Sequence, residues 1–84
     1  MEKRNYFLVF CRNVKAVRES RGMTKKQMSR ILGVSPKTFN RIEAEEIPNI
    51  KIDQIDRFIT HFHLDVEKAC QIPFELWDRQ DGER

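Results

Sequence analysis

The feature that most constrains the fold is a three-residue interval between two helix signals, near the middle of the chain. Gly33 can adopt the left-handed conformation that ends a helix, and Ser35 is a preferred N-cap for the next one. Pro36 suits the first helical position, and Val34 can pack against Phe39 to fix the angle at which the chain enters that helix. A connection this short forces the two helices to cross steeply, which predicts a helix-turn-helix unit.

The helix before this turn has an equally clear start. Thr24 and Gln27 have the spacing of a capping box, and Met23 and Met28 occupy the positions of a hydrophobic staple. We therefore predict one helix from this box to the turn and a second over about 36–44. The expected inward-facing side chains of the two helices are Met28, Ile31, Leu32, Phe39 and Ile42.

Apolar residues at helical spacing predict three further helices, over about 7–21, 50–62 and 66–72. No window alternates with a period of two for long enough to indicate a strand. The predicted fold class is therefore all-α, a compact bundle of about five short helices. The inward-facing residues expected in two of these helices are Phe7, Phe10, Val14 and Val17 in the first, and Ile52, Ile55, Phe58, Ile59 and Phe62 in the next.

The boundaries of these helices follow from single residues. Gly22 is expected to end the first helix, and Asp65 to cap the last, which Pro73 terminates. Residues 45–49 are expected to form a loop, because Pro48 disfavours helix at the residue before it.

The chain has 84 residues, against an average domain of about 150, so we expect one domain over 1–84. Its core is predicted over about 7–72, with 73–84 as a C-terminal extension. The longest apolar run begins at Tyr6 and is far shorter than the roughly 20 residues of a membrane span. It also lacks a signal-peptide cleavage site, so we expect a cytoplasmic protein that does not enter a membrane.

Charge is divided unevenly along the chain. Residues 1–42 carry eleven Lys and Arg against two Glu, whereas residues 43–84 carry five basic and eleven acidic side chains. A basic half of this kind attracts a polyanion such as nucleic acid. The alternative is that these cations only keep helix surfaces in solution.

The helix-turn-helix signals form part of a longer pattern. It includes Val-Arg-Glu-Ser-Arg-Gly-Met-Thr, then Met-Ser-Arg-Ile-Leu-Gly-Val-Ser, then Phe-Asn-Arg-Ile-Glu, with a small residue, Ser29, at the helix crossing. Over about residues 10–70 the chain resembles the phage-repressor and Cro family of helix-turn-helix regulators, also called the XRE family. The resemblance implies a five-helix, lambda-repressor-like bundle that binds double-stranded operator DNA, usually as a twofold dimer.

The second helix of the motif would enter the major groove. Family members read bases from the positions that Pro36, Lys37, Asn40 and Arg41 occupy here. Arg and Lys can donate to guanine, and Asn can pair with adenine through two hydrogen bonds. Pro36 departs from the family pattern, because it offers only apolar contact, for example to a thymine methyl. The alternative is that these residues form an ordinary solvated helix face.

Phosphate contacts are expected where the two motif helices begin, at Thr24, Lys25, Ser35 and Thr38, because helix N-termini present free amide groups. Family members usually carry Gln at the position of Lys25.

The resemblance also implies a structural ion pair between Arg18 and Glu43. The segment after it departs from the family, which often carries Asn-Gly and a basic residue there, whereas this chain carries Glu45 and Glu46. These carboxylates could repel phosphate, pair with Arg41 or contact a partner.

Other chemistries find no support in the sequence. His61 and His63 would lie on different helix faces without further ligands at zinc spacing, so we expect no metal site. Cys11 and Cys70 are expected to be buried hydrophobic residues. No nucleophile–base set and no phosphate-binding glycine loop is present, so we expect neither an enzyme nor a cofactor.

Three functions stay open. The first is a small transcriptional regulator, expected to be a repressor that covers its operator. The second is an antitoxin that represses its own operon and binds a toxin. The third is a protein-interaction module that has lost DNA binding, which Pro36, Glu45 and Glu46 favour.

Both ends of the chain carry bulky apolar residues, from Tyr6 to Phe10 and again after Pro73. They could pack together or form a self-association surface, which, with the family's usual arrangement, predicts a homodimer. Trp77 could be either a lid on the core or an interface anchor.

Overall fold

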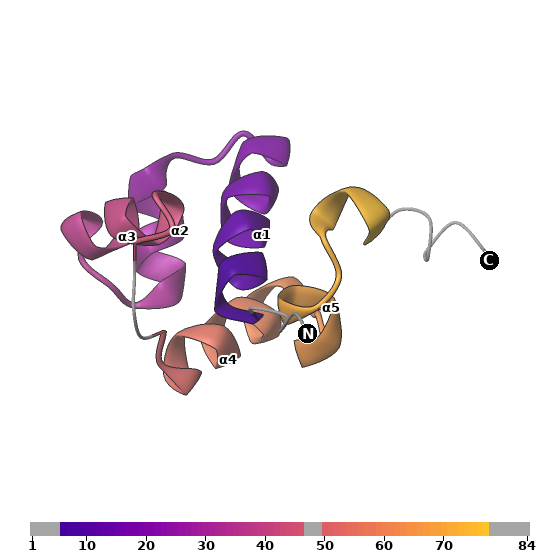
Figure 1. Ribbon diagram of the computed structural model, residues 1–84. Helices are drawn as coiled ribbons and strands as arrows, with labels where there is room; N and C mark the ends of the chain where they lie inside the picture. Colours follow the sequence, from indigo (N-terminus) through magenta and orange to yellow (C-terminus); the bar gives the residue numbers. More distant parts are fainter. Residues whose placement is uncertain (1–5, 47–49, 78–84) are drawn as a thin grey trace.

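The structure, a computed structural model, describes residues 6–46 and 50–77 (Figure 1). Within these stretches the chain is helical, with no strand, so the predicted all-α bundle is confirmed. The helices are α1 (Tyr6–Ser20), α2 (Lys25–Leu32), α3 (Pro36–Glu43), α4 (Ile52–Phe62), α5 (Val66–Cys70) and the short 3-10 helix η1 (Phe74–Leu76).

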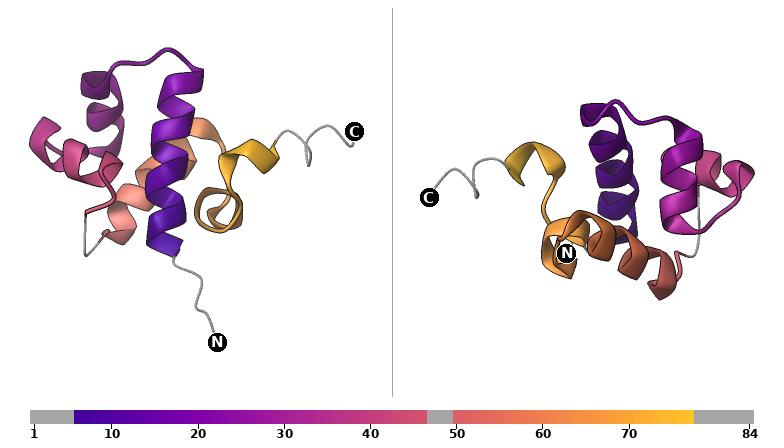
Figure 2. Two further views of the ribbon diagram at one scale, coloured as in Figure 1. Left: turned by 45° about the horizontal axis from the view of Figure 1, so that its top comes forward. Right: turned by 180° about the vertical axis from the view of Figure 1, so that it is seen from behind.

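Helix α1 lies at the centre of the bundle. The α2–α3 pair packs on one side of it, and α5 and η1 pack on the other, as all views show (Figures 1 and 2). Helix α4 contacts both α2 and α5 and so connects the two sides. None of the described helices is long and apolar enough to cross a membrane.

Four of the helices end in the same hydrogen-bonded cap. After α1, α2, α3 and α4 comes a residue in the left-handed conformation, with φ of 65° at Gly22, 73° at Gly33, 62° at Glu45 and 58° at His63. Its amide and the next one donate to carbonyls of the helix's last turn, the Schellman arrangement. Glycine occupies two of these positions, as predicted. At the other two a side-chain-bearing residue adopts a backbone conformation that favours glycine.

The predicted starts of α2, α3 and α5 are confirmed. The Thr24 hydroxyl accepts from the Gln27 amide at 3.0 Å while Gln27 Oε1 accepts from the Thr24 amide at 2.9 Å, so both halves of the capping box form. Ser35 Oγ accepts from the Thr38 amide at 3.1 Å, and Asp65 caps α5. These local bonds satisfy amides that a helix leaves without partners, which is why the sequence pattern alone located them.

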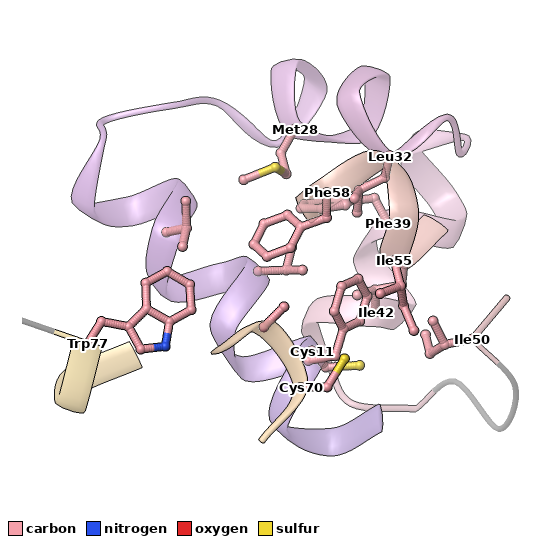
Figure 3. Close-up of a cluster of buried hydrophobic side chains, with 14 residues drawn as sticks. Cys11, Met28, Leu32, Phe39, Ile42, Ile50, Ile55, Phe58, Cys70 and Trp77 are labelled. Atoms are coloured by element: carbon pink, nitrogen blue, oxygen red, sulfur yellow. The ribbon is translucent and has the colours of Figure 1, made fainter. Parts of the chain in front are cut away.

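The core is one cluster that joins all five α-helices (Figure 3). Fourteen residues form it: Phe10, Cys11, Val14, Val17, Met28, Leu32, Phe39, Ile42, Ile50, Ile55, Phe58, Ala69, Cys70 and Trp77.

Two predicted core residues are wrong. Phe7 is 41% exposed, because it lies in the first turn of α1, before the stretch that the other helices cover. Ile52 is 78% exposed. Helix α4 begins at this residue rather than at the predicted position 50, and Ile50, which precedes the helix, is buried in its place.

The C-terminal part is attached to α1 through one buried amide. Asn13 is 1% exposed, and its Nδ2 donates to the carbonyls of Ala69 at 2.9 Å and Ile72 at 3.0 Å. Its Oδ1 accepts from the Phe74 amide at 2.8 Å. Helix α5 therefore ends at Cys70, two residues earlier than predicted, and the chain continues past Pro73 into η1.

Trp77 is 7% exposed, and its Nε1 donates to the Ile72 carbonyl at 2.8 Å. Of its two interpretations, the lid on the core is therefore the one that the structure supports. Figure 3 shows it at one end of the buried cluster. The expected loop at 47–49 and the end of the extension, 78–84, lie outside the described residues.

Replacing Asn13 with Ala should lower the free energy of unfolding by about 2–3 kcal/mol, because the Ala69 carbonyl and the Phe74 amide lose their bonds to this side chain and the Ile72 carbonyl keeps only its bond from Trp77. Chemical denaturation followed by circular dichroism measures this change. Asn40→Ala is the matched control, since Asn40 is an exposed asparagine on α3 and its loss should change stability by less than about 0.5 kcal/mol. Equal effects of the two substitutions would contradict the role of Asn13.

Candidate nucleic-acid interface

The exposed face of α3 carries the residues predicted to read bases. Phe39 and Ile42 are fully buried on the inner face, so Lys37, Asn40 and Arg41 lie on the outer one. Pro36 is also exposed, at the first position of the helix. The structure thus brings all four predicted residues to the outside of one helix of eight residues.

The predicted phosphate-binding hydroxyls also cap the helices. Ser35 Oγ donates to Thr38 Oγ1 at 3.1 Å, in addition to accepting from the Thr38 amide. The Thr24 hydroxyl accepts from the Gln27 amide, so Thr24 and Thr38 can each still donate a hydroxyl proton to a phosphate oxygen.

Lys25 is the first residue of α2, and its side chain reaches α3. Its Nζ is 3.5 Å from Asn40 Oδ1 and 4.0 Å from a carboxylate oxygen of Glu43. When Lys25 donates to the Asn40 carbonyl oxygen, the Asn40 amide nitrogen is left to donate elsewhere, for example to an acceptor on a base edge. The sequence predicts a phosphate contact for Lys25 but carries no signal for its contact with Asn40, because that contact depends on how the two helices cross.

Arg18 and Glu43 come together across α1 and α3. Arg18 Nε donates to Glu43 Oε2 at 2.6 Å, and Arg18 Nη1 donates to the Met23 carbonyl at 3.0 Å. The two side chains are 14% and 6% exposed, so water screens the pair weakly. The pair joins the last turn of α1, the turn before α2 and the end of α3, and so fixes the direction in which α3 presents its outer face.

Glu45, in the segment after α3, pairs with α1 rather than with Arg41. Its carboxylate accepts from Arg12 Nε at 3.1 Å, and both side chains are substantially exposed. The expected alternative in which Glu45 pairs with Arg41 is not found. Arg12 forms this ion pair in the protein without DNA.

Comparison with known proteins agrees with this geometry. The family model of the Cro/C1-type helix-turn-helix DNA-binding domain matches residues 13–73. The chain belongs to the Cro/C1-type helix-turn-helix family. A crystal structure of a transcriptional regulator from Listeria innocua has the same fold, with a TM-score of 0.67 and 22% identity over 88% of this chain and 68% of that one. No curated protein matches the chain.

In this Cro/C1-type domain, the Arg57 side chain of α4 lies against Gly33 in the turn of the motif, a contact that the sequence did not predict. A Cβ added at Gly33 would lie 3.0 Å from the guanidinium of Arg57, which also pairs with Asp53 at 3.3 Å. The Asp53–Arg57 spacing of four residues is the only sequence signal for the pair. Glycine suits Gly33 because of its left-handed backbone conformation, whereas the flexible, half-exposed Arg57 side chain could move away from an added Cβ.

The cysteines of the domain lie in the core. Burial, with a smaller contribution from the charge of Glu45, raises the pKa of Cys11 to about 11, and burial also raises the pKa of Cys70. Both are therefore protonated thiols near neutral pH. Among the described residues, no group of three or more His, Cys, Asp or Glu side chains is placed to hold a metal ion.

Glu43→Gln should lower the free energy of unfolding by about 2 kcal/mol, because it leaves the Arg18 guanidinium largely buried without its carboxylate. Thermal or chemical denaturation measures the change. Asp53→Asn, which breaks the exposed Asp53–Arg57 pair, is the matched control and should cost no more than about 0.5 kcal/mol. If the two substitutions cost the same, the Arg18–Glu43 pair does not anchor α3.

Proposed function

We propose that this protein is a sequence-specific double-stranded DNA-binding regulator that represses transcription by covering its operator. The observation that carries the proposal is the outer face of α3, where Lys37, Asn40 and Arg41 are all exposed on a helix held by its buried face. A major groove admits one helix, and these side chains are the donors and acceptors that distinguish base pairs there.

Phosphate contacts would position this helix. The start of α2 offers free backbone amides and a positive dipole end beside the Thr24 hydroxyl. At the start of α3, Pro36 has no N–H and the Thr38 amide is bonded to Ser35, so the dipole end and the Thr38 hydroxyl are the main groups there that a phosphate would meet. Lys25 adds a positive charge at the start of α2. Such contacts strengthen binding to any sequence, whereas the residues of α3 select the operator.

The structure weakens the case for a protein-interaction module that has lost DNA binding. That alternative depended on Pro36 and on two glutamates close to the expected phosphate path. Glu45 is instead paired with Arg12 on α1, so its charge is partly compensated. An operator-binding function in the cytoplasm, in a single domain without a cofactor, is the simplest account of the remaining features.

Arg41→Ala should remove a guanine contact, cost roughly 1–3 kcal/mol on the preferred site and flatten the preference at one base pair. Lys25→Ala should instead weaken binding to every sequence and lower the salt slope by about one unit. Operators selected from random duplexes, followed by fluorescence titration at several salt concentrations, measure both effects.

Arg30→Ala is the control for loss of an exposed arginine outside α3, and it should leave base preference unchanged. An Arg41→Ala protein that keeps its full specificity ratio would show that α3 does not read bases through this residue. Absence of any salt-dependent DNA binding by the unmodified protein would overturn the proposed function itself.

We also propose that the protein binds its operator as a twofold dimer, with recognition helices about 34 Å apart. Ile72, Phe74 and Trp77 pack on the core, but Tyr6 and Phe7 stay 49% and 41% exposed at the start of α1. These two aromatic side chains are the apolar surface that a partner copy would cover.

A double variant in which both Tyr6 and Phe7 are replaced by Ser should therefore dimerise about tenfold or more weakly, because two large apolar side chains leave the interface. Light scattering over a concentration series measures the oligomeric state. Ile52→Ser, at an exposed apolar residue on α4, should have no effect. If the unmodified protein is monomeric both when free and on its operator, the proposal of a twofold dimer is wrong.

A further inference from the structure

A cavity of about 420 Å³ lies against α5 and η1. These segments pack on the side of α1 away from the α2–α3 pair (Figures 1 and 2). The cavity is bounded by the last turn of α1, the end of α4, and the α5 and η1 segments. Its volume is within the range of about 300–1,000 Å³ that is usual for small-molecule sites. Its apolar lining includes Phe62, Phe74 and Trp77.

The aromatic wall of this cavity is held in place by bonds already described. Asn13 accepts from the Phe74 amide, and Trp77 Nε1 donates to the Ile72 carbonyl, both at 2.8 Å. The rings of Phe74 and Trp77 also pack edge to face, with centroids 4.9 Å apart. Because Trp77 is largely buried and its indole nitrogen is already bonded, the small part of the ring that lines the cavity is apolar and has a fixed orientation. A preformed wall of this kind loses little freedom when a ligand binds.

Among the described lining residues of the cavity, the side chains of Arg21 and Lys68 are cationic. The Arg21 guanidinium lies over the Phe62 ring, 5.1 Å from its centroid, and Lys68 Nζ lies 5.8 Å from the centroid of the Trp77 ring. His63 also lines the cavity, and no acidic side chain is among its described lining residues. Cations beside aromatic faces favour a ligand that combines an anionic group with a flat apolar body.

We infer that this cavity binds a small aromatic carboxylate, with its ring against Phe74 and Trp77 and its carboxylate toward Arg21. The family model ends at residue 73, so this aromatic wall lies outside the part of the chain shared with the Cro/C1-type family. The site lies across α1 from α3, so the inference is independent of the proposed DNA binding, and ligand and DNA would occupy opposite sides of the central helix.

Trp77 is the single tryptophan of the chain, so its fluorescence reports directly on this cavity. Phenylacetate should change the emission in a saturable manner. Phenylacetamide, which keeps the ring but has no charge, and acetate, which keeps the charge but has no ring, should each bind at least about fivefold more weakly. Equal binding of the acid and the amide, or no saturable change with phenylacetate, overturns the inference.

Variants locate the site. Arg21→Gln should weaken phenylacetate binding by about fivefold, whereas Lys15→Gln, at an exposed cation of α1 outside the cavity, should change it by less than about twofold. Circular dichroism verifies that both variants are folded. Amide chemical shifts in the unmodified protein should move at Arg21, Leu64 and Trp77. Shifts confined to α3, or equal effects of the two variants, would show that phenylacetate binds elsewhere and overturn the inference.

Discussion

The arrangement of the bundle depends on the ion pair between Arg18 and Glu43. Helix α3 has eight residues and inserts only Phe39 and Ile42 into the core, and the ion pair adds a polar contact to this apolar packing. The Arg18 guanidinium bonds at once to the Glu43 carboxylate and the Met23 carbonyl, so one side chain sets the end of α3 against α1 and against the turn that leads to α2. The outer face of α3 acquires its direction from this contact.

The same carboxylate extends the connection to the outer surface. Lys25 lies near Glu43 and donates to Asn40, so a sequence of polar contacts runs from the interior of the bundle to a residue proposed to read a base. Charged groups that are partly buried are costly unless they are paired, so a change that separates Arg18 from Glu43 leaves an uncompensated charge inside the bundle. The interface is therefore held by the interior rather than by its own exposed side chains.

The other side of α1 is organised by a neutral group. Asn13 meets three backbone groups of the α5–η1 segment, and among the described residues no buried side-chain polar atom is without a hydrogen-bond partner. An amide can donate and accept at the same time, which is what a chain leaving one helix and entering another requires. Helix α1 is thus joined to α3 by the Arg18–Glu43 ion pair and to the α5–η1 segment by the Asn13 amide.

The sequence by itself determined the features that arise from neighbours in the chain. Helix starts at Thr24, Ser35 and Asp65, and helix ends at Gly22 and Gly33, follow from bonds between residues a few positions apart, so the pattern located the helix-turn-helix and its outward-facing residues. Their roles toward DNA stay predictions.

Only the tertiary structure decided the rest. Glu45 and His63 adopt the left-handed conformation because the caps of α3 and α4 demand it, although neither residue signals it. Apolar periodicity could not show that Ile52 lies outside the core and Ile50 within it, since burial depends on what packs against each side chain. The contacts of Asn13 lie more than fifty residues away along the chain, and such distant pairings are set by how the helices pack.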